Sequence, residues 1–175
     1  MTARSPSEAR RFDRTLAFLE GSVPRGSRLL DIGTPNALGT FLEDNGYSIV
    51  NAHGGDLDVH PELVSGEGYA AATAFEILEH LVNPMGVLKA LKTPRLVASV
   101  PLRLWFAPAY RNESDPWDRH FHEFEDWQFD WLLEASGWEI VRREKWTSRA
   151  SGLGIRPFLR TITPRYYAVE AVRKT

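Results

Sequence analysis

The chain has 175 residues, of which 43% are hydrophobic and 25% charged, with a formal net charge of −2 and no cysteine. This length and composition predict one soluble globular domain, 1–175. The charge balance gives no long-range attraction for nucleic acid or an anionic membrane, so neither partner is expected. The lack of cysteine excludes disulfides, thiolate catalysis and cysteine-ligated metal. We find neither a signal-peptide pattern nor a run of ~20 apolar residues, and therefore expect a cytoplasmic protein.

The first third of the chain alternates between helical and strand patterns. Apolar residues recur at helical spacing over 7–23, and residues 28–32 form a short apolar strand pattern. A second helix is predicted over 37–45, because the following Gly46 is typical of a helix end. Residues 47–52 are apolar and β-branched, which predicts a second strand.

The remaining elements continue this alternation. Small apolar residues at 69–75 are typical of a strand that is covered on both faces. Asn83 and Pro84 predict the start of a helix that runs to about residue 91. Later segments predict a strand over 96–100, a helix over 126–136, and strands over 139–146 and 165–173 joined by a Gly/Pro-rich link. Alternating strands and helices predict an α/β sandwich.

Residues 29–33, Leu-Leu-Asp-Ile-Gly, are the most informative stretch of the sequence. An apolar strand ends in a carboxylate and a glycine and then turns at once into a helix. In open α/β sheets, ligands bind outside the carboxyl ends of the strands. Glycine permits unusual φ values and a close approach of backbone to ligand. We therefore expect Asp31 and Gly33 to face a nucleotide-like ligand; a purely structural role is the alternative.

Two later segments accompany this motif. Residues 75–84 read Phe-Glu-Ile-Leu-Glu-His-Leu-Val-Asn-Pro, and His-Phe-His-Glu-Phe at 120–124 precedes Leu-Leu-Glu-Ala-Ser-Gly-Trp at 132–138. In this order, the three segments resemble the class I S-adenosylmethionine-dependent methyltransferases, especially the small-molecule branch of types 11 and 12. The resemblance covers roughly residues 10–146, and residues 166–172 are similar to the last, antiparallel strand of that family.

The resemblance implies a Rossmann-like open sheet of mostly parallel strands flanked by helices, with the last strand antiparallel. It also implies S-adenosylmethionine as the cofactor and a small molecule as the methyl acceptor. A cationic sulfonium or amino group would then be the partner of the Asp31 carboxylate. The cofactor-binding residues implied at the strand ends are Asp31, Gly33, Thr34, His53, Asp56, Phe75 and Glu76.

The loop after the first strand departs from the family pattern. The family has a glycine-rich loop there, whereas this chain has Pro35 and Ala37 in place of two glycines. Proline fixes φ and lacks an N–H, so the loop should bind the cofactor more weakly.

The region after the second strand departs as well. Only about fifteen residues lie between that strand and Tyr69, where the family has a helix and a further strand, so we expect a trimmed sheet edge. The family's acidic residue that contacts the ribose falls at His53. Asp56 or Asp58 is the alternative contact, although Asp56 also suits a plain turn.

His80 and His120 are the candidate catalytic residues. The unperturbed pKa of histidine suits proton transfer near neutrality, and His80 follows a predicted strand end. A structural hydrogen bond, or a helical pair with Glu76, is the alternative for His80. His120 and His122 would point the same way on an extended segment, as two metal ligands do. No third ligand has convincing spacing, so no metal is expected.

Residues 103–124 form an aromatic insertion between a strand and a helix. An irregular segment of this length is commonly functional or disordered, and its aromatic content argues against disorder. We expect it to supply most of the substrate pocket, with plain packing as the alternative. Its aromatic residues include Trp105, Phe106, Tyr110, Trp117 and Phe121.

These observations favour a methyltransferase that acts on a small molecule. The alternative from another class is a methyltransferase-like domain without turnover that serves as a binding or regulatory module. A nicotinamide dinucleotide enzyme is disfavoured, because no Gly-x-Gly-x-x-Gly follows the first strand. The pattern predicts neither the acceptor nor the oligomeric state.

Overall fold

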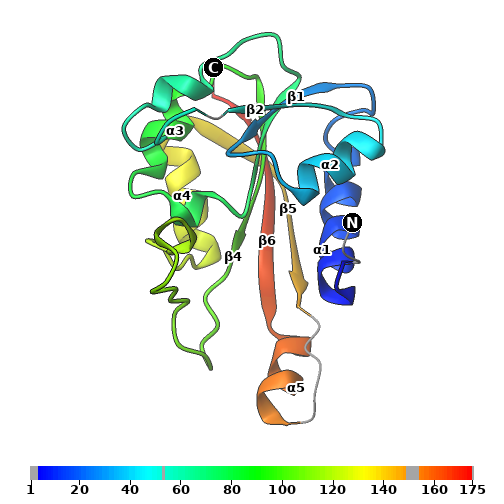
Figure 1. Ribbon diagram of the computed structural model, residues 1–175, viewed down its shortest axis with the longest axis vertical. Helices are drawn as coiled ribbons and strands as arrows, with labels where there is room; N and C mark the ends of the chain where they lie inside the picture. The colour runs from blue at the N-terminus through cyan, green and yellow to red at the C-terminus, as the bar shows by residue number, and fades with distance from the viewer. Residues whose placement is uncertain (1–3, 53, 149–153, 175) are drawn as a thin grey trace.

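The computed structural model describes residues 4–52, 54–148 and 154–174. Six strands form one sheet: β1 (Arg28–Ile32), β2 (Ser48–Ala52), β3 (Ala71–Phe75), β4 (Arg95–Pro101), β5 (Trp138–Thr147) and β6 (Pro164–Arg173). Their order across the sheet is β2-β1-β3-β4-β6-β5 (Figure 1). β1 to β4 pair in parallel, and β6 pairs antiparallel with both of its neighbours. The predicted open sheet with an antiparallel last strand is confirmed.

Helices cover both faces of this sheet. The helices are α1 (Pro6–Glu20), α2 (Ala37–Asp44), α3 (Pro84–Ala90), α4 (Asp126–Ala135) and α5 (Ile155–Ile162), with short 3₁₀ turns η1 (Pro61–Val64), η2 (Leu78–His80) and η3 (Pro116–Asp118). α1 and α2 lie on one face, and α3 and α4 lie on the other (Figure 1). Asn83 caps α3 by accepting the N–H of Gly86, as the Asn-Pro pair predicts. None of the helices described combines the length and apolarity that crossing a membrane requires.

Alternation along the strands divides the core between the two faces. Leu29 packs with Phe18 and Leu42 beneath α1 and α2. Its neighbour Leu30 belongs to the opposite cluster, which includes Phe129 of α4. Successive strand residues point to opposite faces, so a continuous apolar run is what a doubly covered strand requires.

The trimmed sheet edge is also confirmed. β2 is an edge strand, and the described residues between β2 and β3 contain η1 as their only helical or strand element. The sheet therefore ends at the strand that follows α2.

α5 corrects the sequence-based expectation of a plain link between the last two strands. It begins after Gly154, which has a φ of 141°. Pro157 lies in the first turn of α5, where its missing N–H costs no helical hydrogen bond. The helix lies beyond the ends of β5 and β6 (Figure 1).

Trp138 provides a test of this core. Its side chain is fully buried at the start of β5, and its indole N–H donates to the carbonyl of Leu88 at 3.1 Å. We expect Trp138→Ala to lower the free energy of unfolding by about 3–5 kcal/mol, because it removes apolar contacts and leaves a cavity. Urea denaturation followed by circular dichroism measures the effect.

Trp131→Ala is the matched control. Trp131 lies on α4 and is 64% exposed, so its removal should change the free energy of unfolding by no more than about 0.5 kcal/mol. Equal losses in the two variants would contradict the packing described above.

Candidate functional site at the carboxyl edge of the sheet

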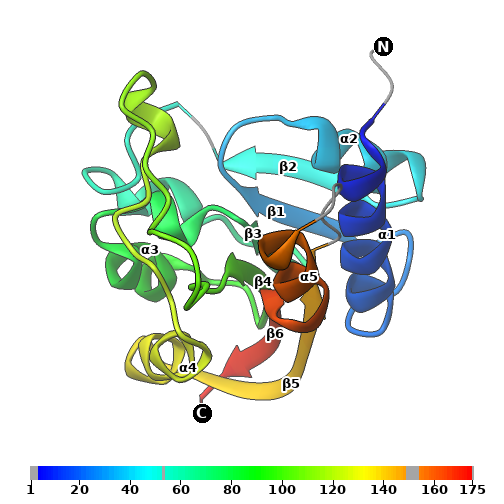
Figure 2. The ribbon, with the colours of Figure 1, turned by 90° about the horizontal axis from the view of Figure 1, so that it is seen from below.

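The carboxyl ends of the parallel strands carry the polar residues of the candidate site. Asp31 lies near the end of β1, Glu76 follows β3, and β4 ends at Pro101. Because these strands run in the same direction, their ends meet at one edge of the sheet. The aromatic insertion leaves β4 at this edge, and in Figure 2 the arrow of β2 points towards the side on which the segment between β4 and α4 lies.

Asp31 is buried and hydrogen-bonded to the two strands beside it. Its carboxylate accepts from the Thr73 hydroxyl at 2.6 Å and from the Asn51 amide at 3.1 Å. Burial raises the pKa of Asp31 to about 6, although both hydrogen bonds oppose that shift. The strands on either side of β1 therefore supply two of the hydrogen-bond donors that this buried carboxylate needs.

Gly33 opens the loop after β1. Its φ is 115°, a conformation that glycine adopts without strain, and the backbone then turns towards α2. A cavity of about 100 Å³ lies beside this loop, and we call it the Asp31 cavity. Five of the residues predicted to bind a cofactor line it: Asp31, Gly33, Thr34, Phe75 and Glu76.

Of the other two predicted cofactor contacts, only Asp56 is among the described residues. The Asp56 carboxylate accepts the N–H of Asp58 at 2.9 Å, which is the hydrogen bond of a turn, and Asp56 does not line the Asp31 cavity. The Asp58 carboxylate accepts the N–H groups of Val82 and Asn83 and so ties this loop to the start of α3. His53 lies outside the residues that the structure describes.

Glu76 adopts a backbone conformation that few residues other than glycine tolerate. Its φ is 52°, the only positive value among the non-glycine residues described. The turn is held from β4, because Ser99 accepts the Glu76 N–H with its carbonyl at 2.9 Å and donates its hydroxyl to the carboxylate at 2.8 Å. Strained backbone of this kind concentrates at functional sites.

A second cavity, of about 290 Å³, is also lined by Glu76, and we call it the His80 cavity. The predicted catalytic residues His80 and His120 both line it, and their rings meet edge to face with centroids 4.7 Å apart. Glu76 lines both cavities. The structure thus brings the two histidines together and links them to the loop after β1.

Backbone hydrogen bonds hold the insertion against η2. The carbonyl of Glu79 accepts the N–H groups of Phe121 and His122, at 2.8 and 3.2 Å. The Nδ1 of His80 donates to the carbonyl of Arg119 at 3.1 Å. These contacts place His120 beside His80 although the two residues lie far apart in the sequence.

Burial controls the charge of the groups in the His80 cavity. Burial raises the pKa of the Glu79 carboxyl well above its usual range, and the nearby Glu76 carboxylate raises it further. Burial lowers the pKa of His120, and the charge of His80 acts in the same direction. His120 is therefore neutral at pH 7.

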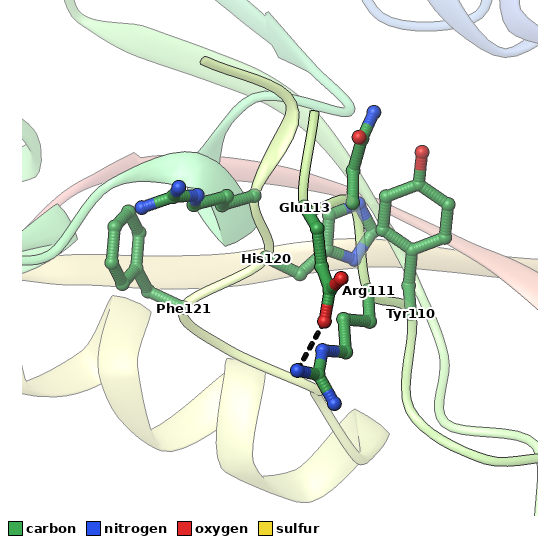
Figure 3. Close-up of a pocket in the computed structure, with 7 residues that line it drawn as sticks. Tyr110, Arg111, Glu113, His120 and Phe121 are labelled. Carbon is green, nitrogen blue, oxygen red and sulfur yellow. Dashed lines mark ion pairs between the residues drawn. The ribbon is translucent and has the colours of Figure 1, made fainter. Parts of the chain in front are cut away.

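A third cavity, of about 340 Å³, lies within the insertion itself (Figure 3). Tyr110 and His120 line both this cavity and the His80 cavity, and their rings lie 4.4 Å apart. The insertion therefore borders the His80 cavity through Tyr110, Asp118 and His120. Trp105 and Trp117 are 73% and 80% exposed, and neither lines the His80 cavity.

Several residues of the His80 cavity were not identified from the sequence. Glu79 is part of the 75–84 motif, but nothing in the sequence gave it a role. The others come from separate elements that only the fold brings together, and no local pattern marks them: Arg11 from α1, Asp118 from η3, and Arg165 and Tyr166 from β6.

Solved structures resemble the chain along most of its length. A SAM-dependent methyltransferase from Methanosarcina mazei matches with a TM-score of 0.60 at 13% identity, over 90% of this chain and 97% of that one. The magnesium protoporphyrin IX methyltransferase of Synechocystis PCC 6803, solved with bound SAH, matches with a TM-score of 0.57 at 14% identity, over 96% and 84%. The [4+2]-cyclase SpnF matches with a TM-score of 0.57 at 13% identity, over 99% and 84%.

These likenesses show that the chain has the fold of class I SAM-dependent methyltransferases. No protein-family model matches the sequence, and no curated protein matches it either. The finer resemblance to types 11 and 12 stays a prediction.

The buried Asp31 carboxylate should reduce stability at neutral pH. Its pKa is about 6 in the fold and about 4 in an unfolded chain, so the folded state holds the proton more tightly. Stability should therefore fall as the pH rises from 4 to 6, by about 3 kcal/mol, and stay lower above that range. We expect Asp31→Asn to be more stable than the parent at pH 7 and to lose this pH dependence.

Denaturation by urea at pH 4.5 and pH 7 measures this difference. Asp44→Asn, at an exposed position on α2, is the control and should match the parent at both pH values. A less stable Asp31→Asn at pH 7 would show that the hydrogen bonds of Asp31 outweigh its burial.

Proposed function

We propose that the chain is an S-adenosylmethionine-dependent methyltransferase that acts on a small molecule. The observation that carries this proposal is that Glu76 lines both the Asp31 cavity and the His80 cavity. Methyl transfer requires donor and acceptor side by side, with the reacting atoms aligned. Two adjoining cavities, one at the loop after β1 and one at a histidine pair, meet that requirement.

The residues at the Asp31 cavity suit a cationic ligand. The Asp31 carboxylate offers a negative charge at the strand end, and Gly33 leaves its backbone open. A Cβ at Gly33 would meet nothing closer than Ile77, at 3.6 Å, so this space is not filled by the protein. Asp31, Gly33 and Thr34 would hold the methionine end of the cofactor, which supplies an electrophilic methyl group when bound.

Residues of the His80 cavity would act on the acceptor. His120 is neutral at pH 7 and can take a proton from an acceptor hydroxyl or amine as its oxygen or nitrogen attacks the methyl group. His80 is held through its Nδ1 and keeps the His120 ring in place from the side. Tyr110 forms part of the wall on the insertion side.

A binding or regulatory module without turnover is the second candidate. The Asp31 cavity, at about 100 Å³, is smaller than the ~300 Å³ or more of most ligand pockets. In addition, the Asn36 side chain accepts the N–H groups of Leu38 and Gly39, so the α2 N-terminus is already capped. Both observations favour a chain that binds the cofactor weakly or not at all.

Titration calorimetry with S-adenosylmethionine and its demethylated product tests the proposal. The parent should bind both, and Gly33→Val should lower affinity at least tenfold, about 1.4 kcal/mol, because the side chain fills the approach to the loop. Gly26→Val is the matched control. Gly26 also has a positive φ, 85°, but lies in a turn with nothing near its Cβ position.

The two variants share the backbone strain of a branched residue at positive φ, so only Gly33→Val should lose binding if both remain folded. A folded parent that binds neither compound would overturn the methyltransferase proposal and favour the module.

Restoring glycine in the loop tests why binding would be weak. Pro35→Gly with Ala37→Gly should tighten cofactor binding several-fold, because the loop regains the freedom to close on the ligand. Calorimetry gives the affinity, and urea denaturation controls for stability. Weaker binding at unchanged stability would show that Pro35 holds the loop in its binding conformation.

A further inference from the structure

Three side chains of the His80 cavity are arranged as metal ligands. One nitrogen or oxygen atom from each of Glu79, His80 and His120 lies within 4.8 Å of the other two. Glu79 and His80 belong to η2, whereas His120 comes from the insertion. No third ligand for His120 could be recognised by its spacing in the sequence, because this ligand set is completed across the fold rather than along one strand.

The carboxylate of Glu79 lacks a partner that its burial would require. Glu79 is 1% exposed, and none of the residues that the structure describes donates a hydrogen bond to its Oε2. Arg11 and Arg165 line the same cavity, but neither forms an ion pair with Glu79 among the residues described. A buried polar atom without a partner costs about 1–3 kcal/mol, so such atoms are rare.

Protonation of Glu79 does not remove this problem. A neutral carboxyl group carries a hydroxyl that needs an acceptor, and within the described part of the chain Oε2 has neither a donor nor an acceptor. A cation bound by this carboxylate would balance its buried charge.

His80 is held as a metal-bound histidine usually is, and His120 has a carboxylate near its Nδ1, although beyond hydrogen-bond distance. His80 donates through Nδ1 to the Arg119 carbonyl, which leaves Nε2 free at 3.8 Å from Oε1 of Glu79. The Nδ1 of His120 lies 3.7 Å from a carboxylate oxygen of Glu123. A carbonyl or carboxylate behind the second ring nitrogen is the common support of a metal-ligating imidazole.

We propose that Glu79, His80 and His120 bind one divalent metal ion of the zinc type. Two imidazoles and one carboxylate suit Zn²⁺, which forms bonds of ~2.0–2.2 Å to these atoms. Tetrahedral ligands at that distance lie about 3.3 Å apart, so the side chains need to move by only about 1 Å. Three protein ligands leave one position open towards the cavity.

The open position gives the ion a role if the proposed function holds. It would bind the oxygen of a hydroxylated acceptor, lower the pKa of that hydroxyl and fix its position beside the methyl donor. His80 and His120 would then act on the acceptor through the ion. The metal site itself depends only on the three side chains and not on methyl transfer.

Zinc binding to the protein, prepared without a histidine tag and stripped with a chelator, tests the site. Calorimetry should give one Zn²⁺ per chain, and Glu79→Gln and His120→Asn should each weaken binding at least tenfold. His122→Asn is the matched control, because His122 lies two residues from His120 but faces the Val82 carbonyl. It should bind zinc as the parent does. Mg²⁺, which prefers oxygen ligands, should bind much more weakly.

The absorption spectrum of the parent loaded with Co²⁺ tests whether the metal site exists, even if a variant fails to fold. Intense visible bands of a four- or five-coordinate ion support the site, and the spectrum of the hydrated ion overturns it. Absent zinc binding, or unchanged affinity in folded Glu79→Gln and His120→Asn, would also overturn it. Because no cofactor is present in these measurements, failure of S-adenosylmethionine binding leaves their outcome unaffected.

Discussion

The backbone turn after β3 is the constraint on which the site depends. Glu76 holds a φ of 52°, and Ser99 fixes it through both a backbone and a side-chain hydrogen bond. This turn lets the chain leave the sheet between the Asp31 cavity and the His80 cavity. It also presents the Glu79 carbonyl to the N–H groups of Phe121 and His122, which seats the insertion. If the turn relaxed, the two cavities would lose their shared wall.

The sheet could be predicted because burial on both faces leaves a pattern that the sequence carries locally. Leu29 and Leu30 pack on opposite faces, and only a strand covered on both sides permits two such residues in succession. The trimmed edge followed from counting residues before Tyr69. α5 was missed because it is short and holds Pro157, and because its position depends on how far β5 and β6 extend.

Only the part of the candidate site that lies at the ends of the strands could be predicted from the sequence. Asp31 and Gly33 were found because strand ends collect ligand contacts, but the hydrogen bonds from Thr73 and Asn51 depend on pairing with strands that are distant in sequence. The expectation of no metal has the same cause, because contacts between residues that are distant in the sequence leave no local pattern. Spacing alone paired His120 with its near neighbours, whereas the fold pairs it with η2.

Asp31 and Glu79, two buried carboxylates of the site, differ in how fully their oxygens are hydrogen-bonded. Asp31 receives two donors from the neighbouring strands, so its burial raises the pKa only to about 6 and it is ionised at pH 7. Glu79 is as deeply buried, yet one of its oxygens has no partner among the residues described, and a second carboxylate, Glu76, lies nearby. A side chain selected for stability alone would be apolar at this position. The protein instead keeps an acidic group beside two histidines, an arrangement that a bound cation would stabilise.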